Sequence, residues 1–489
     1  MATTQSVSSS GTINFSGLAT GIDTSSIVSQ LMALERAPEQ ILTSQKTKMQ
    51  SQVDAYNKLS SALTSLQSLM AGMNTADTFA AKTASVADNT VAVATATSAA
   101  QTGTHTLKVT SLAKSQTLVS ESSANSGYAS DTAQNFGTGT IVIADTTGGK
   151  SPVSVNIDNT NNSLQGIAKA INASGANVTA SVVNDGSGTP YRLAIIGKDT
   201  GTYSVTSTLS GGTYDAPTFN EKVAASQAVF QLDGVDMTRT TNTVSDAMPG
   251  ISLTLQGTTF NAAGTTITIG NDTSAVTTKI NNFVAGYNSV MTLINQDTAY
   301  DSTTNTAGVL FGDSTIRTVL DTLQTTLTNQ LSGATGSFSS LADIGINSDA
   351  HTGLLSVDSS KLSDALNSGF SSVTSLFTQN TENYGLALNQ YGIAEQFNKQ
   401  IDFLTHYYSG YSGTGPLNNG IISTRIQGLN DSMTNIDNQI AAMEVRLTAE
   451  ESNMNAQFTA MEQLISNTTA WGNQLLAGLG VSTTSTKSG

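Results

Sequence analysis

The chain has 489 residues, which predicts about three or four domains at roughly 100–200 residues each. It contains no cysteine, which excludes disulfides, zinc–thiolate sites and a cysteine nucleophile. The 20 Lys and Arg against 35 Asp and Glu give a net charge of −15, which argues against binding to nucleic acid or to an anionic membrane, since both need clustered positive charge.

The first predicted helices lie within residues 24–73. Ile27, Leu31 and Leu34 share one face of a short segment for which Asp23 or Thr24 is a candidate N-cap. A strict alternation of three- and four-residue steps then predicts a helix that keeps one stripe against a partner helix, as in a coiled coil. Gln45 and Gln52 are polar positions of this seam. Its apolar positions are Leu42, Met49, Tyr56, Leu59, Leu63, Leu66 and Met70.

The middle of the chain, about residues 77–272, reads as β-strands. Apolar and polar residues alternate there with a period of two, which places one face on a core and the other in water. The alternation is clear at 105–109, 141–143, 153–157, 178–182, 191–195, 251–255 and 267–269. The clusters at 184–186 and 232–234 indicate turns. One short helix is predicted over 163–171.

After about residue 273 the pattern becomes helical again, and it ends in a second heptad. Glu450 and Gln457 interrupt the apolar seam of this heptad. Its apolar positions are Ile436, Ile440, Met443, Leu447, Met454, Met461 and Leu464. Two matching heptads at opposite ends of one chain predict that the two ends pair with each other.

The predicted fold class is a multidomain α+β protein, in which both chain ends form a helical coiled-coil stalk and two nested antiparallel β-rich domains form a head. The expected boundaries are a flexible N-terminal segment at 1–40, a stalk helix at 41–76, an outer β head domain at 77–116 and 221–272, an inner β head domain inserted at 117–220, a second part of the helical stalk domain at 273–435 and a C-terminal coiled-coil segment at 436–489.

No motif in the sequence supports catalysis. Residues 144–151 (ADTTGGKS) resemble a phosphate-binding loop, but Pro152 and an alternating strand pattern follow where such a loop needs a helix, so we predict a β-hairpin turn. The three histidines are far apart in the sequence. We therefore predict no enzyme activity and no catalytic, cofactor-binding or metal site. The sequence contains no run of 18 apolar residues, so we predict no membrane insertion. Residues 1–17 lack the pattern of a general secretory signal.

Segments along nearly the whole chain resemble, in order, the flagellar filament cap family, hook-associated protein 2. The N-terminal matches are 13–23 (INFSGLATGID) and 31–36 (LMALER). The central matches are 109–116 (VTSLAKSQ), 232–235 (LDGV), 249–255 (PGISLTL), 341–346 (LADIGI) and 355–358 (LSVD). The C-terminal matches are 407–413 (YYSGYSG), 420–429 (GIISTRIQGL) and the helix at 433–464. The segment 117–220 resembles the family least.

The resemblance implies a non-enzymatic protein that is secreted through the flagellar export channel and assembles as a pentamer-like homo-oligomeric ring at the filament tip. Such a ring retains exported flagellin and promotes its folding and insertion as the filament grows. The implied partners are flagellin, the hook-filament junction proteins and a cytoplasmic export chaperone.

The resemblance also assigns expected roles to residues. Terminal segments of the family act as legs on the growing filament, so Ile13, Phe15 and Leu18 become expected N-terminal leg contacts. The C-terminal heptad from Ile436 to Leu464 becomes the expected contact for the filament end and the chaperone. Two alternatives stay open, namely another flagellar axial protein, such as flagellin or a junction protein, and a tip adhesin that binds host mucin or glycans.

Overall fold

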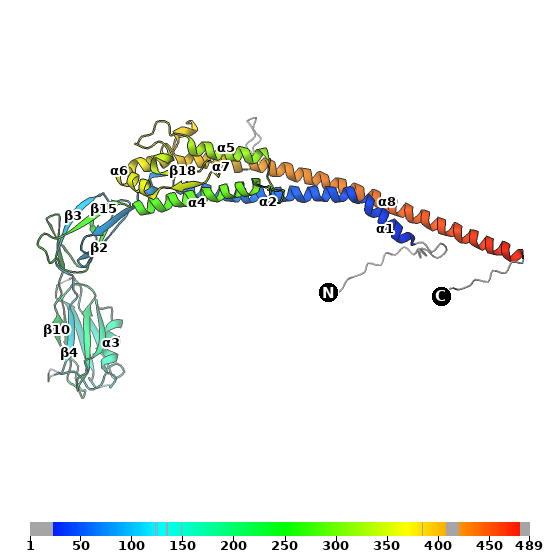
Figure 1. Cartoon of the computed structure of the whole chain (residues 1–489). Coiled ribbons are helices and arrows are strands. Elements are labelled where there is room, and N and C mark those ends of the chain that lie inside the picture. The colour runs from blue at the N-terminus through cyan, green and yellow to red at the C-terminus, as the bar shows by residue number, and fades with distance from the viewer. Residues whose placement is uncertain are drawn as a thin grey trace. The chain divides into compact units, whose positions relative to one another are not determined.

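The computed structural model describes residues 23–122, 124, 126–133, 135–147, 149–383, 385–406 and 420–479. They divide into two compact units, one built from the residues up to 74 and from 279 onward, and the other from residues 75–278. The chain is a mixed protein of helices and antiparallel sheets (Figure 1).

The first unit is built mainly from long helices. They are α1 (Thr24–Glu35), α2 (Ala37–Ala71), α4 (Thr273–Thr298, which begins in the other unit), α5 (Ser314–Thr328), α6 (Ser359–Thr378), α7 (Ile393–Thr405) and α8 (Ile421–Gly478). Two short 3₁₀ turns, η2 (Leu341–Ile344) and η3 (Leu388–Gln390), also belong to this unit. Its two small hairpins are β16 (Tyr300–Asp301) with β17 (Thr306–Ala307), and β18 (Ile346–Ser348) with β19 (Leu355–Val357).

Local sequence explains where several of these helices begin. The carboxylate of Asp23 accepts a hydrogen bond from the Ser26 amide and caps α1, which confirms one of the two predicted N-caps. Asp313 caps α5 in the same way through the amide of Thr315. Pro38 lies in the first turn of α2, where its missing N–H costs nothing, and a break at Arg36 separates α1 from α2.

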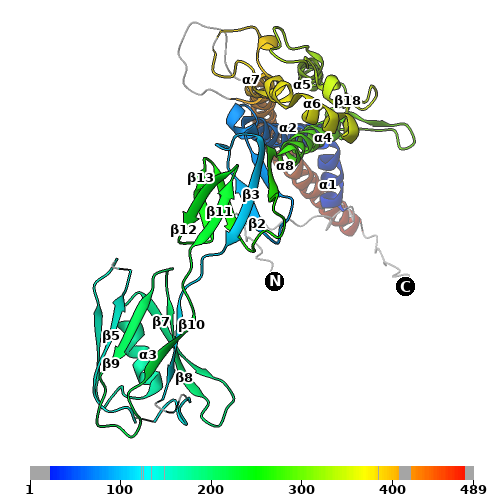
Figure 2. The same ribbon diagram turned by 90° about the vertical axis from the view of Figure 1, so that its left-hand side faces the viewer.

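The second unit contains two separate β cores. The core that we call the outer β core lies between a five-stranded and a three-stranded antiparallel sheet (Figure 2). In sheet order, the larger sheet contains β1 (Lys82–Val86), β15 (Thr265–Asn271), β3 (Gly103–Ser111), β11 (Ala228–Leu232) and β12 (Val235–Arg239). The smaller contains β13 (Thr243–Met248), β14 (Ile251–Leu255) and β2 (Ala92–Ala96), and η1 (Ala76–Phe79) precedes β1.

The inner β core is also formed by two antiparallel sheets, together with one helix. The four-stranded sheet contains β10 (Thr218–Val223), β4 (Thr117–Glu121), β8 (Tyr191–Gly197) and β7 (Val178–Asn184). The three-stranded sheet contains β6 (Val153–Ile157), β5 (Gly139–Asp145) and β9 (Tyr203–Ser207). Helix α3 (Leu164–Ala173), capped by Ser163, buries Leu164, Ile167 and Ile171 in this core, as the sequence predicts.

The two β cores interleave along the chain. Residues 84–113 and 228–269 contribute to the outer core, whereas residues 118–219 contribute to the inner core. The chain therefore passes from one core to the other twice, and an antiparallel bridge between Lys114 and Ser226 joins the two crossing segments.

Two predicted turns are confirmed. Ala144 and Asp145 end β5, Ile143 of β5 pairs with Val153 of β6, and the strand β6 follows Pro152 where a phosphate-binding loop would need a helix. The β11–β12 hairpin turns at Asp233 and Gly234, whose φ angles of 51° and 83° are left-handed. A turn with two left-handed residues matches the twist of the strands it joins, and Asp-Gly is a sequence that favours it.

Candidate functional site

The side chains that the first heptad predicts to face a partner helix lie along one face of α2. Tyr56, Leu59, Leu63, Leu66 and Met70 are buried almost completely. The earlier positions, Leu42 and Met49, are half-buried, and Gln45 is exposed. The stripe is thus most deeply covered in its C-terminal half.

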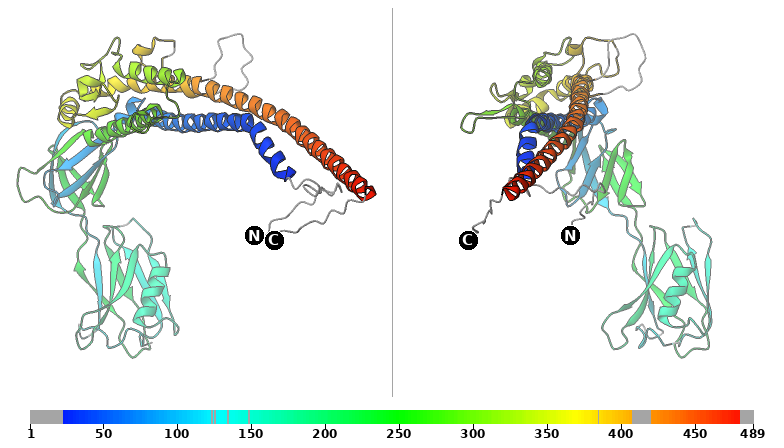
Figure 3. Two further views of the ribbon diagram at one scale, coloured as in Figure 1. Left: turned by 45° about the vertical axis from the view of Figure 1, so that its right-hand side comes forward. Right: turned by 90° about the vertical axis from the view of Figure 1, so that its right-hand side faces the viewer.

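Two helices from the C-terminal part of the chain cover α2. Lys46 lies 2.5 Å from Asp437 of α8, and the amide of Gln67 donates to the carbonyl of Asn398 in α7 at 3.3 Å. α2 is therefore antiparallel to α8 and α7, which follow each other along it (Figure 3). Gly286 of α4 approaches Leu66 and Leu69 closely enough that a Cβ at this position would meet the Leu69 side chain at 2.7 Å.

A charged pair lies beside the buried stripe of α2. The guanidinium of Arg425 in α8 donates to one carboxylate oxygen of Asp313 through Nη2 at 2.9 Å and Nε at 3.2 Å. The Asp313 side chain is only 5% exposed, and its other oxygen accepts from the Thr315 amide at 2.8 Å. Burial raises the pKa of Asp313, but the bonds from Thr315 and Arg425 outweigh it and hold the pKa below its usual value. Burial, and then the nearby Asp313, raises the pKa of Tyr56.

Sequence reasoning missed this pair. Asp313 and Arg425 are 112 residues apart, so no local pattern connects them. The available signal was limited to the Asp-Ser-Thr start of α5, which is typical of an N-cap but does not identify a basic partner.

The short helix α1 packs on the middle of α8. Val28 and Met32 form a small buried cluster with Leu447, which Met443, Met454 and Phe458 border. The face of α1 predicted as apolar, with Ile27, Leu31 and Leu34, is instead exposed. Val28 and Met32 form a second apolar face of α1, and the position of α8 decides which of the two faces is buried.

The last part of α8 presents an apolar stripe that the described residues leave uncovered. We call it the distal stripe; it contains Leu464, Trp471 and Leu475 of α8 and the C-cap residue Leu479, which are between 67% and 77% exposed. Their spacings of seven, four and four residues place them on one side of the helix. An uncovered row of large apolar side chains is typical of a surface that binds another protein.

The predicted C-terminal contact residues are therefore distributed among three environments. Ile436 and Leu447 are buried, and Leu464 belongs to the exposed distal stripe. The half-buried ones are Ile440, Met443, Met454 and Met461. The predicted N-terminal contacts, Ile13, Phe15 and Leu18, lie outside the described residues. α8 is continuous across residue 436, where the sequence suggested a boundary.

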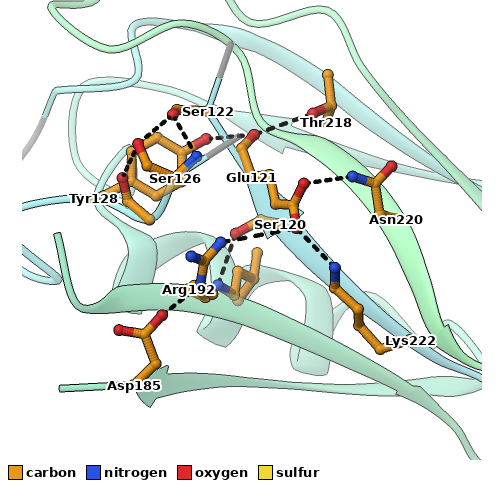
Figure 4. Close-up of polar contacts among 12 residues, drawn as sticks. Ser120, Glu121, Ser122, Ser126, Tyr128, Asp185, Arg192, Thr218, Asn220 and Lys222 are labelled. Carbon is orange, nitrogen blue, oxygen red and sulfur yellow. Dashed lines mark hydrogen bonds and ion pairs between the residues drawn. The ribbon is translucent and has the colours of Figure 1, made fainter. Parts of the chain in front are cut away.

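The inner β core carries the other notable polar cluster (Figure 4). Glu121 of β4 receives the ammonium of Lys222 at 2.8 Å and the amide of Asn220 at 2.6 Å, both from the region of β10. Arg192 of β8 lies 3.9 Å from the same carboxylate and bonds Asp185 at 2.7 Å. Hydrogen bonding by Lys222 is the main reason that the pKa of Glu121 is lowered. The cluster joins three strands of one sheet and contains no nucleophile beside a general base, so we assign it a structural role.

The described residues form neither a cluster that could hold a metal ion nor a helix that could span a membrane. Among these residues no three His, Asp or Glu side chains come together in a way that could hold a metal ion. None of the described helices has a stretch of sufficient length and hydropathy to cross a bilayer.

Two family models match the chain. The model described as the flagellar hook-associated protein 2 N-terminus matches residues 20–116, and the one described as its C-terminus matches residues 225–470.

Individual relatives extend the match along the chain. The flagellar hook-associated protein 2 of Escherichia coli (strain K12) is 31% identical over 471 residues, covering 92% of this chain and 94% of the relative. The B-type flagellar hook-associated protein 2 of Pseudomonas aeruginosa is 27% identical over 480 residues, again covering 92% and 94%. The crystal structure of the D1-D2-D3 domains of the flagellar cap protein FliD from Escherichia coli covers 77% of this chain and 99% of that one, with 29% identity and a TM-score of 0.51.

Proposed function

The chain belongs to the flagellar hook-associated protein 2 family, and on that basis we propose that it is a structural cap at the distal end of a bacterial flagellar filament, outside the cell. The observation that carries this proposal is the similarity to an Escherichia coli relative over 92% of the chain. Capping makes and breaks no covalent bond, so the protein acts without enzyme activity. Secretion through the flagellar export channel is part of the same proposal.

The helical unit acts as the stalk of this cap and the two β cores act as its nested head domains. Support for a stalk comes from α2, whose buried stripe is covered by α7 and α8 from the other end of the chain. Support for nested heads comes from the order of the core residues along the chain, since outer-core segments flank the inner core. The expected domain boundaries at 40, 76, 116, 220, 272 and 435 belong to this proposal.

Several copies form a ring that retains exported flagellin and promotes its folding and insertion. The distal stripe supports a role in contact with protein partners, because a soluble helix rarely presents four large apolar side chains to water without a binding role. We assign to this stripe the contact with the filament end, and to α8 as a whole the contact with an export chaperone. The junction proteins below the filament are the remaining expected partners.

A complementation experiment tests the function. A strain that lacks its own cap protein would receive this chain with Leu464, Trp471 and Leu475 each replaced by Asp. These side chains are exposed, so the fold should persist, while three charges should abolish apolar docking. We expect flagellin monomers in the medium and no filaments, as measured by electron microscopy and by immunoblotting of the culture supernatant.

The matched control places the same three charges on neighbouring exposed positions of α8, as Gln463→Asp, Ala470→Asp and Gln474→Asp. We expect filaments of normal length from this variant. Failure of the unmodified chain to restore filaments would overturn the cap function itself, whereas normal filaments from the distal-stripe variant would overturn only the role of the stripe.

A further inference from the structure

The apolar stripe of α8 repeats every seven residues with side chains of similar size. If α8 moved by seven residues toward its N-terminus, Leu429 would take the place of Ile422, and Ile436 that of Leu429. On the neighbouring row, Ile440 would replace Met433 and Leu447 would replace Ile440. Against α1, Met454 would take the position of Leu447. Glu450 would, however, take the place of Met443 beside this cluster. Apolar packing against α2 therefore distinguishes only weakly between the two registers, and the packing against α1 favours the observed one.

The exposed ion pair between α2 and α8 does not distinguish them either. Lys46 bonds Asp437 in the observed register, and seven residues further along α8 stands Glu444, which offers the same carboxylate. Both partners of the observed pair are at least 40% exposed, so water also screens this contact.

The charged pair between Asp313 and Arg425 responds differently to the same shift. Asp313 is fixed in place because it caps α5 through the Thr315 amide, and its carboxylate is almost completely buried. In the shifted register Ser432 would stand where Arg425 stands now. The carboxylate would then lose both guanidinium bonds and keep only the Thr315 amide and the nearby Tyr56 hydroxyl as partners, which is a costly arrangement for a charge in this position.

We propose that the Asp313–Arg425 pair selects the register in which α8 packs on α2, and so determines how far α8 extends beyond α1. A shift of seven residues would move the distal stripe by about 10.5 Å along the helix axis. The pair therefore acts as a positioning device for the stripe. This inference concerns the fold of the helical unit and stands whether or not the chain caps a filament.

Contacts at the first turn of α8 favour the observed register as well, but less strongly. The Ser423 hydroxyl donates to the Thr405 carbonyl at 2.7 Å, and the Gly420 amide bonds the His406 carbonyl. In the shifted register the first two turns of α8 would unwind into the connection to α7. The polar groups of these two turns would then form hydrogen bonds with water, whereas water has little access to the carboxylate of Asp313.

The cysteine-free chain allows a direct test by cross-linking. Cysteines at positions 46 and 437, or at 46 and 444, would be joined by a short bis-maleimide in the full-length protein. In the unaltered background we expect the 46–437 product and little 46–444 product. The arginine would then be moved by one heptad, as Arg425→Ser with Ser432→Arg, which keeps the composition unchanged.

Moving the arginine should move the helix. The transplanted guanidinium at position 432 can reach Asp313 only if α8 shifts by seven residues, and that shift brings position 444 to position 46. We expect the ratio of 46–444 to 46–437 product to rise about tenfold or more. Retention of the 46–437 product in the folded variant would overturn the proposal, since packing or the first turn of α8 would then set the register.

A second variant covers the case in which the transplanted arginine prevents folding. Asp313→Asn with Arg425→Met removes both charges but keeps a side chain that can cap α5. We expect this variant to yield both cross-linked products, whereas exclusive 46–437 product would contradict the proposal.

A parallel set of variants would carry Arg317→Gln, because Arg317 is one turn from Asp313 in α5 and could replace Arg425 as its partner. Both sets should give the same result.

Discussion

Single carboxylates connect segments that are distant in the sequence. Asp313 joins the start of α5 to α8, and Glu121 joins β4 to Lys222 and Arg192. Each has several donors, which offsets the loss of water around a partly buried charge. Asp343 shows the same principle within one turn, since its carboxylate accepts from the amides of Ser339 and Ser340. These residues determine which segments meet, whereas apolar burial provides most of the stability.

The carboxylates of the inner β core predict sensitivity to acid. The pKa of Glu121 lies below its usual 4.5, and hydrogen bonds from Ser187 and then Arg192 lower the pKa of Asp185 to about 2. A pKa lowered by folding contributes stability that is present above the usual value and is lost as the pH falls through the folded value. We therefore expect hydrogen exchange of β4 and β10 in the full-length protein, corrected for intrinsic rates, to accelerate between about pH 4.5 and about pH 2.

The Glu121→Gln variant tests this effect. It should exchange faster than the unaltered chain near pH 7 and show a smaller change on acidification, because the group that titrates is gone. Glu221→Gln is the matched control, since it removes one charge from β10 but keeps an oxygen that can accept from Gln116. Equal protection in the Glu121→Gln variant and the unaltered chain near neutral pH would refute a role for the cluster in holding β10.

At the scale of elements, the helical unit depends on how one long helix is covered. α2 buries its stripe against α8 in one half and α7 in the other, and α4 approaches it at Leu66, so a single predicted seam has several partners. α8 in turn packs against α2 and, further along, against α1. The second heptad thus pairs with the N-terminal region in two pieces, joined by the break at Arg36.

Leu63→Asp tests the buried stripe of α2. Leu63 is fully buried, so the change removes apolar burial and inserts a charge, and we expect the helical unit to lose at least about 3 kcal/mol of unfolding free energy. Thermal unfolding followed by circular dichroism near the helix minimum measures the loss. Ser61→Asp, on the exposed side of the same helix, should leave the transition nearly unchanged. A melting curve for Leu63→Asp that matches this control would mean that the stripe is not an interface.

At the scale of the whole molecule, two compact units are joined by the chain at residues 74–75 and 278–279. Each has its own buried residues, and the two β cores lie entirely within one unit. An insertion with a core of its own does not need the host helices to bury its apolar surface.

We therefore expect the fragment 75–278 to fold in isolation. It should give a β-type circular dichroism spectrum and a cooperative thermal transition, because both of its cores are internal. In the full-length protein, Leu63→Asp should shift the transition of the helical unit and leave the transition of the β unit in place. An unfolded fragment, or a single transition that shifts as a whole, would show instead that the two units stabilise each other.

Much of the local structure was readable from the sequence alone. Period-two alternation identified β-strands, the 163–171 pattern identified α3, and Pro152 identified a hairpin in place of a phosphate-binding loop. Such patterns predict local structure because they depend only on residues that are close together in the sequence. The heptads likewise identified the buried stripe of α2, since a 3.5-residue period requires a continuous apolar face.

Tertiary structure decided what covers each face. The sequence placed Ile27, Leu31 and Leu34 on the apolar face of α1, whereas the position of α8 buried Val28 and Met32 instead. The Asp313–Arg425 pair depends on a meeting of residues 112 positions apart, which no local period encodes. A periodic stripe states that a helix needs a partner, but the partner and its register follow from long-range contacts that form only when the whole unit folds.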